Sequence, residues 1–368
     1  MYVKEIYLEN FRNYKKQHVC FSKNLNILYG NNAQGKTNML ESIFLGAIGK
    51  SFKPVSEKEM IMFGEKFSDI RIDYFSSGRD MYNTVRLFSE KKKAVSVNGV
   101  ELTKMSELLG KLTVVVFTPE ELSLIKDGPF ARRRFLDISI SQIKPKYLHT
   151  LSSYNRVLEQ KNKLLKEIKY TPSLEKTLSL WNEQLALYGS KIILYRIEFI
   201  KRIMETAAKI HREISKNKEE LTVKYKTVDF SAENMSEKNI KEALTQLLEK
   251  NYDKEITFAQ AVTGPHRDDL IFYINGNNSK VFGSQGQQRT TVLSLKLAQK
   301  ELFLEETGEE PILLLDDITG ELDLSRREYL FSKIKNSQVF ITCTDTDRIE
   351  NTKNAKYFNI SDGKVCEK

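Results

Sequence analysis

The sequence has few cysteines and no long apolar run, which argues against several classes of protein. Its 368 residues include three cysteines, Cys20, Cys343 and Cys366, at no metal-binding spacing, so neither a disulfide framework nor a zinc motif is indicated. No run of about 18 apolar residues is present, which argues against a membrane span. The first residues alternate and carry charge, unlike a signal peptide. We therefore expect a folded protein of the reducing cytoplasm without a membrane partner.

Glycine is nearly absent between residues 129 and 217, where only Gly189 occurs. Apolar residues at helical spacing predict two long helices there, with a turn near Pro172. The net charge of the chain is +9, and residues 141–220 hold 16 Lys/Arg against 9 Asp/Glu, a net of +7. A basic helical hairpin of this kind is suited to phosphate-backbone contacts with DNA, although a solvated charged face is an equally ordinary outcome.

The pattern on either side of this stretch predicts an α/β domain. Alternating or β-branched runs predict strands, and long periodic runs predict helices at 237–250 and 286–305. The expected strands cover residues 2–9, 17–23, 26–29, 68–75, 81–89, 94–97, 100–103, 112–117, 221–226, 270–274, 279–282, 311–315 and 338–342. This order predicts a mixed sheet with parallel central strands and helices on its faces. The expected divisions are a head over 1–128, a basic helical arm over 129–220 and the remainder of the head over 221–368.

A phosphate-binding loop is the clearest motif. A short apolar strand runs into a G-x-x-x-x-G-K-T segment, and a helical period follows it. Its residues are Gly30, Asn31, Asn32, Ala33, Gln34, Gly35, Lys36 and Thr37. Backbone N–H groups of such a loop surround a phosphate, helped by the helix N-terminus. We expect Lys36 to reach the β- and γ-phosphates of ATP and the Thr37 hydroxyl to bind Mg²⁺.

Two carboxylates end a buried apolar strand late in the chain. Asp316 and Asp317 follow four apolar residues, as expected of a central strand covered on both faces. We expect Asp316 to hold Mg²⁺ together with Thr37, and Asp317 to polarise the attacking water. A solvated strand end is the alternative.

A Ser-x-Gly-Gln segment precedes this strand. Ser284 can cap the next helix, whose N–H groups then point at an anion, and Gly286 lets that backbone approach closely. Gln287 belongs to the same segment. Its position before the metal strand predicts contact with the nucleotide of a second subunit, whereas a simple capped helix is the alternative. Asp323 follows Gly320 and Glu321, and either caps a helix or belongs to a loop at the same dimer interface.

Other polar motifs leave more than one role open. Arg12 follows the first strand and is a candidate for contact with phosphate or DNA, with a plain surface arginine as the alternative. Arg132, Arg133 and Arg134 begin a helix on which they point in different directions, so a single phosphate clamp is not expected. His266 and Arg267 lie in a rigid polar turn, for which a place near phosphate or DNA is one option, but the sequence assigns neither residue a role.

Taken together, these motifs resemble those of the RecF family, ATPases related to SMC and ABC-type heads. The segments that carry the resemblance are Leu8-Glu9-Asn10-Phe11-Arg12-Asn13-Tyr14, the phosphate-binding loop, Phe117-Thr118-Pro119-Glu120-Glu121-Leu122, Arg132-Arg133-Arg134-Phe135-Leu136-Asp137, Gly264-Pro265-His266-Arg267-Asp268-Asp269, Ser284-Gln285-Gly286-Gln287-Gln288-Arg289 and Leu313-Leu314-Leu315-Asp316-Asp317. They occur in the family's order across nearly the whole chain.

The resemblance implies an ATPase head with a short helical arm. It further implies ATP-dependent dimerisation on single-stranded or gapped DNA, slow DNA-stimulated hydrolysis, action with RecR and RecO in loading recombinase at gaps, and a link to replication recovery and the SOS response. The alternative is the head of a chromosome-structure (SMC-like) or transporter-type ABC protein. The strand over 338–342 is followed by Cys343 and Thr344, without a transporter's switch histidine, and the arm is too short for an SMC coiled coil.

Overall fold

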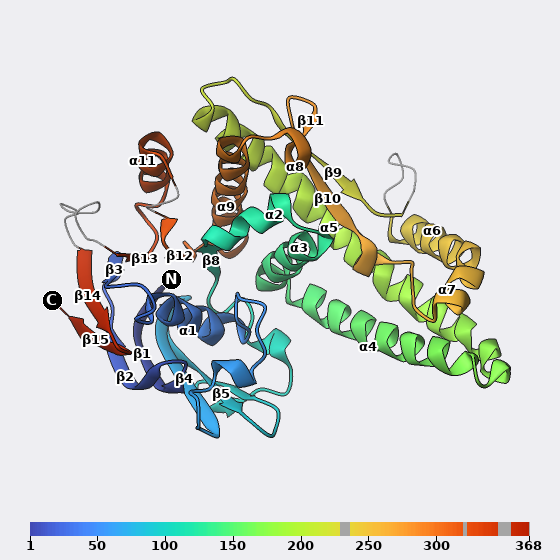
Figure 1. The fold of residues 1–368 in the computed structure, drawn as a ribbon, viewed down its shortest axis with the longest axis horizontal. Coiled ribbons are helices and arrows are strands. Elements are labelled where there is room, and N and C mark those ends of the chain that lie inside the picture. The colour runs from blue at the N-terminus through green and yellow to red at the C-terminus, as the bar shows by residue number, and fades with distance from the viewer. Residues whose placement is uncertain (229–235, 319–321, 345–354, 368) are drawn as a thin grey trace. The chain divides into compact units, whose positions relative to one another are not determined.

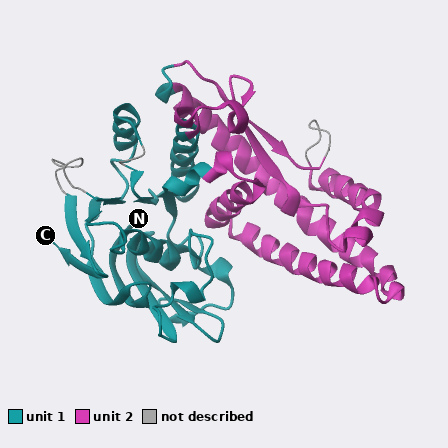
Figure 2. Ribbon diagram, viewed as in Figure 1, with its two compact units in different colours: residues 1–122, 213–216, 289–368 teal, residues 123–212, 217–288 magenta. Residues whose placement is uncertain are grey.

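The computed structural model describes residues 1–228, 236–318, 322–344 and 355–367. The chain divides into two compact units (Figure 2). The first comprises residues 1–122, 213–216 and 289–368, and the second comprises residues 123–212 and 217–288. The second unit is larger than the arm expected over 129–220, because the segment that follows the long helices forms its own small sheet there.

A six-stranded mixed sheet forms the centre of the first unit. Its strand order is β15-β14-β3-β13-β12-β8, and all neighbours are parallel except the edge pair of β14 and β15. The strands are β3 (Leu25–Tyr29), β8 (Val114–Phe117), β12 (Ile312–Leu315), β13 (Val339–Cys343), β14 (Ala355–Ser361) and β15 (Lys364–Glu367). Strands β8, β12 and β13 are buried along their whole length, as continuous apolar runs predict for a covered parallel sheet.

A second sheet of the first unit is antiparallel, with strand order β2-β1-β4-β5-β6-β7 (Figure 1). Its strands are β1 (Tyr2–Phe11), β2 (Tyr14–Cys20), β4 (Phe67–Ser76), β5 (Arg79–Phe88), β6 (Ala94–Val97) and β7 (Val100–Glu101). Buried residues alternate with more exposed ones along β4 and β5, because one face of each strand packs inward.

Helix α1 (Lys36–Ile48) contacts β1, β4 and β5 of the antiparallel sheet and β13 of the mixed sheet. Every residue from Met39 to Ile48 is therefore buried. Close packing explains Gly46, since a Cβ there would lie 2.8 Å from the Ile72 side chain. Other helices among the described residues of this unit are η1 (Lys58–Met60), η2 (Met105–Glu107), η3 (Pro119–Leu122), α11 (Leu324–Lys333) and, from Arg289 onward, α9 (Gln285–Thr307).

The second unit is mainly helical. Its elements are α2 (Ser123–Lys126), α3 (Pro129–Ile143), α4 (Pro145–Ile168), η4 (Pro172–Thr177), α5 (Leu178–Ile214), β9 (Leu221–Lys226), α6 (Glu237–Lys250), α7 (Tyr252–Phe258), η6 (Pro265–Arg267), β10 (Asp269–Ile274), β11 (Asn277–Asn278) and α8 (Ser279–Phe282). The two predicted long helices are α4 and α5. Among the described residues, no helix is long and apolar enough to cross a lipid bilayer.

One predicted strand is wrong. Residues 279–282 form the short helix α8, because Asn278 caps it with a hydrogen bond from the Lys280 N–H at 3.0 Å. The hairpin after β10 consequently closes with only two residues of β11.

Candidate nucleotide-binding site

The phosphate-binding loop connects β3 with α1 in the first unit. Gly30 has φ +146°, Ala33 has φ +63° and Gly35 has φ +117°, so the loop uses backbone conformations that glycine adopts most easily. A Cβ on Gly30 would lie 2.3 Å from the carbonyl oxygen of Ile360 in β14. The loop thus turns tightly against the last parallel strand of the sheet.

Lys36 lies at the first position of α1, with its ammonium group turned back over the loop. Its Nζ donates to the carbonyl oxygens of Gly30 at 2.6 Å and Asn31 at 2.8 Å. Partial burial lowers the pKa of Lys36, while Asp317, Cys343 and Asp316 oppose that shift. The positive charge and the strand-end carboxylates therefore belong to one electrostatic cluster.

Thr37 and Asp316 come together from opposite ends of the sequence. The Thr37 hydroxyl donates to Asp316 Oδ1 at 2.9 Å, and the Thr342 hydroxyl donates to the same oxygen at 2.7 Å. Asp316 is 6% exposed. Burial raises its pKa, and the two threonine hydrogen bonds act in the other direction. Hydroxyl and carboxylate oxygens are the ligands that Mg²⁺ prefers.

Asp317 is positioned by a backbone contact at the end of β13. Its N–H donates to the Thr342 hydroxyl at 2.9 Å, and its backbone lies in the left-handed region with φ +48°. Thr342 therefore orders both carboxylate residues, one through the side chain and the other through the backbone. The sequence contains no signal for this role, because Thr342 reads only as part of a buried strand.

The turn between β1 and β2 supports the loop from another side. Asn13 donates to the Gln34 carbonyl at 2.8 Å and Tyr14 donates to the Gly35 carbonyl at 3.0 Å. The side chain of Asn38 donates to Asn13 at 3.0 Å. These polar contacts tie the loop and the start of α1 to the first hairpin.

Arg12 is engaged by protein acceptors. Its Nε and Nη2 each donate to Glu41 at 2.9 Å, and its Nη1 donates to the Glu59 carbonyl at 2.7 Å. Glu41 is fully buried on α1 and also accepts from Ser51. Arg12 thus links the first hairpin to the helix behind the loop, and its contact with phosphate stays a prediction. Sequence reasoning missed Glu41, which lies within an apolar helix face.

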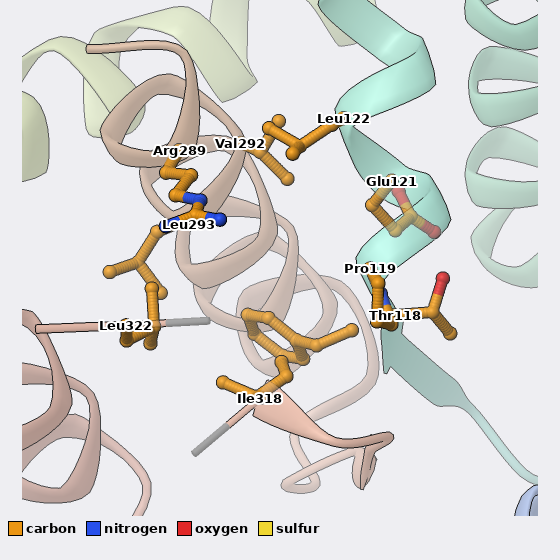
Figure 3. Close-up of a pocket in the computed structure, with 10 residues that line it drawn as sticks. Thr118, Pro119, Glu121, Leu122, Arg289, Val292, Leu293, Ile318 and Leu322 are labelled. Atoms are coloured by element: carbon orange, nitrogen blue, oxygen red, sulfur yellow. The ribbon is translucent and has the colours of Figure 1, made fainter. Parts of the chain in front are cut away.

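An open hollow of about 550 Å³ lies on the Asn13 and Asn38 side of the loop. Residues 58, 59 and 61–65 line its other side, and Phe63 is fully exposed there. A separate pocket of about 50 Å³ is lined in part by Ile318, the residue after Asp317 (Figure 3). It is lined by Thr118, Pro119, Glu121, Leu122, Arg289, Val292, Leu293, Ile318 and Leu322, together with Phe117. This second pocket is mainly apolar and too small for a nucleotide, and Ile318 and Leu322 line it together with Val292 and Leu293 of α9.

Ser284, Gly286 and Gln287 begin α9 in the second unit. Ser284 Oγ accepts from the Gln287 N–H at 3.2 Å, and the Gln287 side chain accepts from the Ser284 N–H at 2.9 Å. This reciprocal arrangement is a capping box. Ser284 is exposed, and its contact with a second subunit stays a prediction.

Asp323 caps α11, as one of its two predicted roles requires. Its Oδ1 accepts from the Arg326 N–H at 2.9 Å, and this hydrogen bond lowers the pKa of Asp323. Gly320 and Glu321 lie outside the described residues. A role of Asp323 at a dimer interface stays a prediction.

The arginine-rich segment 132–137 and the segment 264–269, which had no assigned role, meet in a polar network inside the second unit. Arg132 makes a two-point ion pair with Asp269, at 2.6 and 3.0 Å, and Arg133 donates to the Asp268 carbonyl. Arg196, which is 2% exposed, donates to Asp268 and to Asp137 at 2.9 Å each. The two arginine- and aspartate-rich motifs thus join α3, α5 and β10.

His266 is part of the same region. Tyr154 donates to its Nδ1 at 2.6 Å, and its Nε2 donates to the Ala261 carbonyl at 3.2 Å. Burial lowers the pKa of His266 to about 4. Arg267 donates to the same Ala261 carbonyl at 2.9 Å. His266 is therefore a neutral structural residue at physiological pH.

The comparison with known proteins covers nearly the whole chain. The family model of the RecF/RecN/SMC N terminal domain matches residues 2–365. DNA replication and repair protein RecF of Acetivibrio thermocellus is 45% identical over 353 residues, which are 95% of each chain. The same protein of Clostridium tetani is 41% identical over 369 residues and is covered, like this chain, in full.

Solved structures of RecF and of an Smc head are also similar to this chain. The structure of the recombination mediator protein RecF with ATP in the RecFOR pathway has a TM-score of 0.94 at 38% identity, covering 100% of this chain and 97% of that one. An Smc head bound to the C-winged helix domain of ScpA has a TM-score of 0.56 at 17% identity, covering 100% and 98%, which shows the fold alone. The chain belongs to the RecF family, within the RecF/RecN/SMC group of ATPase heads.

Proposed function

We propose that this protein is an ATP-operated, DNA-binding switch of DNA replication and recombinational repair. The observation that carries the proposal is the hydrogen bond from Thr37 to Asp316, at 2.9 Å. It joins the phosphate-binding loop to the metal-binding strand end, which is the arrangement that nucleotide hydrolysis requires. RecF relatives of matching length, and a solved RecF structure with ATP, support the assignment.

ATP enters with its phosphates in the loop of Gly30–Thr37 and its nucleoside in the hollow beside Asn13 and Asn38. Lys36 then exchanges its carbonyl partners for phosphate oxygens. Thr37 and Asp316 would hold Mg²⁺, and its charge would offset the negative charge of the phosphates. The buried Asp316 gains most from a cation, because its ionised form is disfavoured without one.

Hydrolysis requires a base or a water-positioning group beyond the γ-phosphate. Asp317 supplies it, since the left-handed backbone and the Thr342 hydroxyl fix its position next to Asp316. The reaction is slow and is stimulated by DNA, because its task is to reset a switch. ATP binding sets the DNA-bound state, and hydrolysis ends it.

Dimerisation places two ATP molecules between two copies of the chain. Lys36 of one copy and Ser284 of the other contact the same triphosphate. The Ser284 capping box leaves its hydroxyl exposed at the start of α9, where helix N–H groups favour an anion. Asp323 lies in the loop that faces the partner copy.

DNA binds along the basic helices of the second unit. Helices α4 and α5 have 24 and 37 residues, or roughly 36 and 55 Å at 1.5 Å per residue. These two helices are too short for the long coiled-coil arm of a chromosome-organising protein. Their length therefore favours the RecF-like role over the SMC-like one. The partners are RecR and RecO, the substrates are single-stranded or gapped DNA, and the setting is the bacterial cytoplasm and the SOS response.

Light scattering tests the switch. The untagged protein is measured with ATP or ADP, with and without gapped DNA, as wild type and as the variants Lys36→Ala and Ser284→Arg. We expect ATP to double the wild-type mass. Lys36→Ala loses ATP binding, whereas Ser284→Arg keeps it but stays monomeric.

The matched control is Ser152→Arg, at an exposed serine on α4, which should dimerise like the wild type. A wild type that remains a monomer with ATP and DNA contradicts the dimer. Unchanged ATP affinity in Lys36→Ala contradicts the assigned loop.

A further inference from the structure

Three side chains with metal-ligating atoms project from one face of the β1–β2 hairpin, away from the phosphate-binding loop's own residues. Glu5 lies directly opposite Cys20 in the antiparallel register, and Tyr7 lies opposite His18. Alternate residues of a strand share a face. Glu5, His18 and Cys20 therefore stand side by side, although the sequence shows only a histidine and a cysteine two residues apart.

The ligating atoms of these residues form a compact triangle. His18 Nε2 lies 2.8 Å from Glu5 Oε2, and Cys20 Sγ lies 3.6 Å from each of these two atoms. In a tetrahedral zinc site, bonds of 2.0–2.3 Å separate neighbouring ligand atoms by about 3.3–3.8 Å. Two sides of the triangle already have this length, and a small side-chain rotation opens the third.

The surroundings hold the histidine in place. The Tyr7 ring stacks on the His18 ring with centroids 4.1 Å apart and an interplanar angle of 5°. Arg71 on β4 lies over the Tyr7 ring, 5.5 Å from its centroid. The strand pairing thus fixes the backbones of the three ligating residues, and the ring stack orients His18, as a preorganised metal site needs.

We propose that Glu5, His18 and Cys20 form a binding site for Zn²⁺, with water as the fourth ligand. A thiolate, an imidazole and a carboxylate are the three ligand types that zinc takes in proteins. The side chain of His18 is 48% exposed and that of Glu5 30%, so an ion can enter from solvent. On binding, the thiol proton of Cys20 passes to solvent as the zinc–sulfur bond forms.

An ordinary cross-strand ion pair between Glu5 and His18 is the competing explanation. An exposed pair of this kind contributes little to stability and needs no sulfur atom nearby. The two explanations differ in what Cys20 does. If the site binds zinc, Cys20 is a ligand, and its replacement changes affinity and spectrum together.

Bound zinc would connect β1 with β2 near the end of the hairpin opposite the Asn13–Tyr14 turn. A ligand that binds only the folded state stabilises it by an amount that grows with ligand concentration. We therefore expect zinc to raise the thermal stability of the free protein independently of nucleotide. This readout does not depend on ATP hydrolysis or on dimerisation.

The test uses the full chain without a histidine tag, stripped of metal, and titrated with Zn²⁺ against a chromophoric chelator and then with Co²⁺ alone. We expect one tight equivalent of zinc and a cobalt–thiolate charge-transfer band. Cys20→Ser should abolish the band and lower the affinity for Zn²⁺ at least tenfold. His18→Ala should also lower the affinity for Zn²⁺.

Cys366→Ser is the matched control, because Cys366 is also exposed, and it should behave as the wild type. Asp316→Asn should keep the band, which separates this site from the proposed magnesium site. Absence of a tight equivalent in the wild type, or a band that survives Cys20→Ser, overturns the proposal.

Discussion

The backbone N–H of Gly363 lies 3.3 Å from the carbonyl oxygen of Gln34, so the turn between β14 and β15 contacts the phosphate-binding loop directly. The neighbouring Asp362 N–H donates to the Gln34 side chain at 2.6 Å. Together with the β1–β2 turn, this contact holds the loop from two sides. The loop's shape therefore depends on residues near both ends of the sequence.

Gly363→Ala should weaken ATP binding and destabilise the first unit. A Cβ at this position would lie 2.1 Å from the Asn13 carbonyl oxygen, and φ is +70°. We expect a loss of about 2–3 kcal/mol in unfolding free energy and at least a tenfold higher Kd for ATP. Thermal melts and a nucleotide titration measure the two effects.

Gly78→Ala is the control for backbone strain alone. Gly78 has φ +76°, but a Cβ added there would meet no atom of the described residues within 4 Å. This variant should lose about 1 kcal/mol and bind ATP normally. Equal behaviour of the two variants would show that the contact with Asn13 is unimportant.

Asp316→Asn should stabilise the nucleotide-free protein while removing magnesium-dependent hydrolysis. Burial raises the pKa of Asp316, so its ionised form costs folding free energy at pH 7. An asparagine can still accept from Thr37 and Thr342. We expect a gain on the order of 1 kcal/mol, seen as a melting temperature a few degrees higher.

The pH dependence of this gain has a defined sign. Because the folded-state pKa is raised, lowering the pH through that pKa protonates Asp316 and stabilises the wild type. The advantage of Asp316→Asn should therefore shrink in acid. An advantage that grows as the pH falls would contradict the assigned shift.

His266 should make the wild-type protein less stable as the pH falls from about 6.5 to about 4. Its folded pKa is lowered to about 4, whereas an unfolded histidine titrates near 6.5. Between these values the unfolded chain binds the extra proton, which costs up to about 3 kcal/mol of stability. His266→Gln should flatten this part of the profile.

Chemical denaturation at several pH values measures the difference. The control is His149→Gln, at an exposed histidine of the same unit, whose profile should match that of the wild type. Parallel profiles for the wild type and His266→Gln would exclude a neutral, buried His266.

Arg132→Lys should destabilise the second unit by about 2–3 kcal/mol. The guanidinium of Arg132 holds Asp269 at two points and also donates to the Leu124 and Asp127 carbonyls at 3.0 Å. A single ammonium cannot satisfy all of these acceptors. Urea melts compare it with Arg156→Lys, at an exposed arginine of α4, which should be neutral. A neutral Arg132→Lys would refute the structural role.

Local patterns predicted most of the elements. The strand–loop–helix around Lys36 and the long helices α4 and α5 each depend on neighbouring residues, so periodicity and turn chemistry predicted them. The strand expected over 279–282 failed because a two-residue capping interaction at Asn278 outweighs a short alternating pattern.

Long-range polar pairs could not be predicted. Arg12 with Glu41 and Thr342 with Asp316 are specified only by the folded chain. The sequence also indicated no zinc motif, since Glu5 reaches His18 across the strand pair rather than along the chain. Tertiary packing also decides which unit residues 221–288 belong to. The sequence placed them in the head, whereas they pack with the long helices in the second unit.

Strand β3, which leads into the phosphate-binding loop, pairs on one side with β13 and on the other with β14. On the ribosome, β3 emerges early and both of its neighbours emerge only after the whole second unit has been made. A nascent chain therefore carries an unfinished nucleotide pocket throughout most of its synthesis. The chain can therefore bind ATP only after β13 and β14 have been made. Truncated translation products of this protein should not bind ATP.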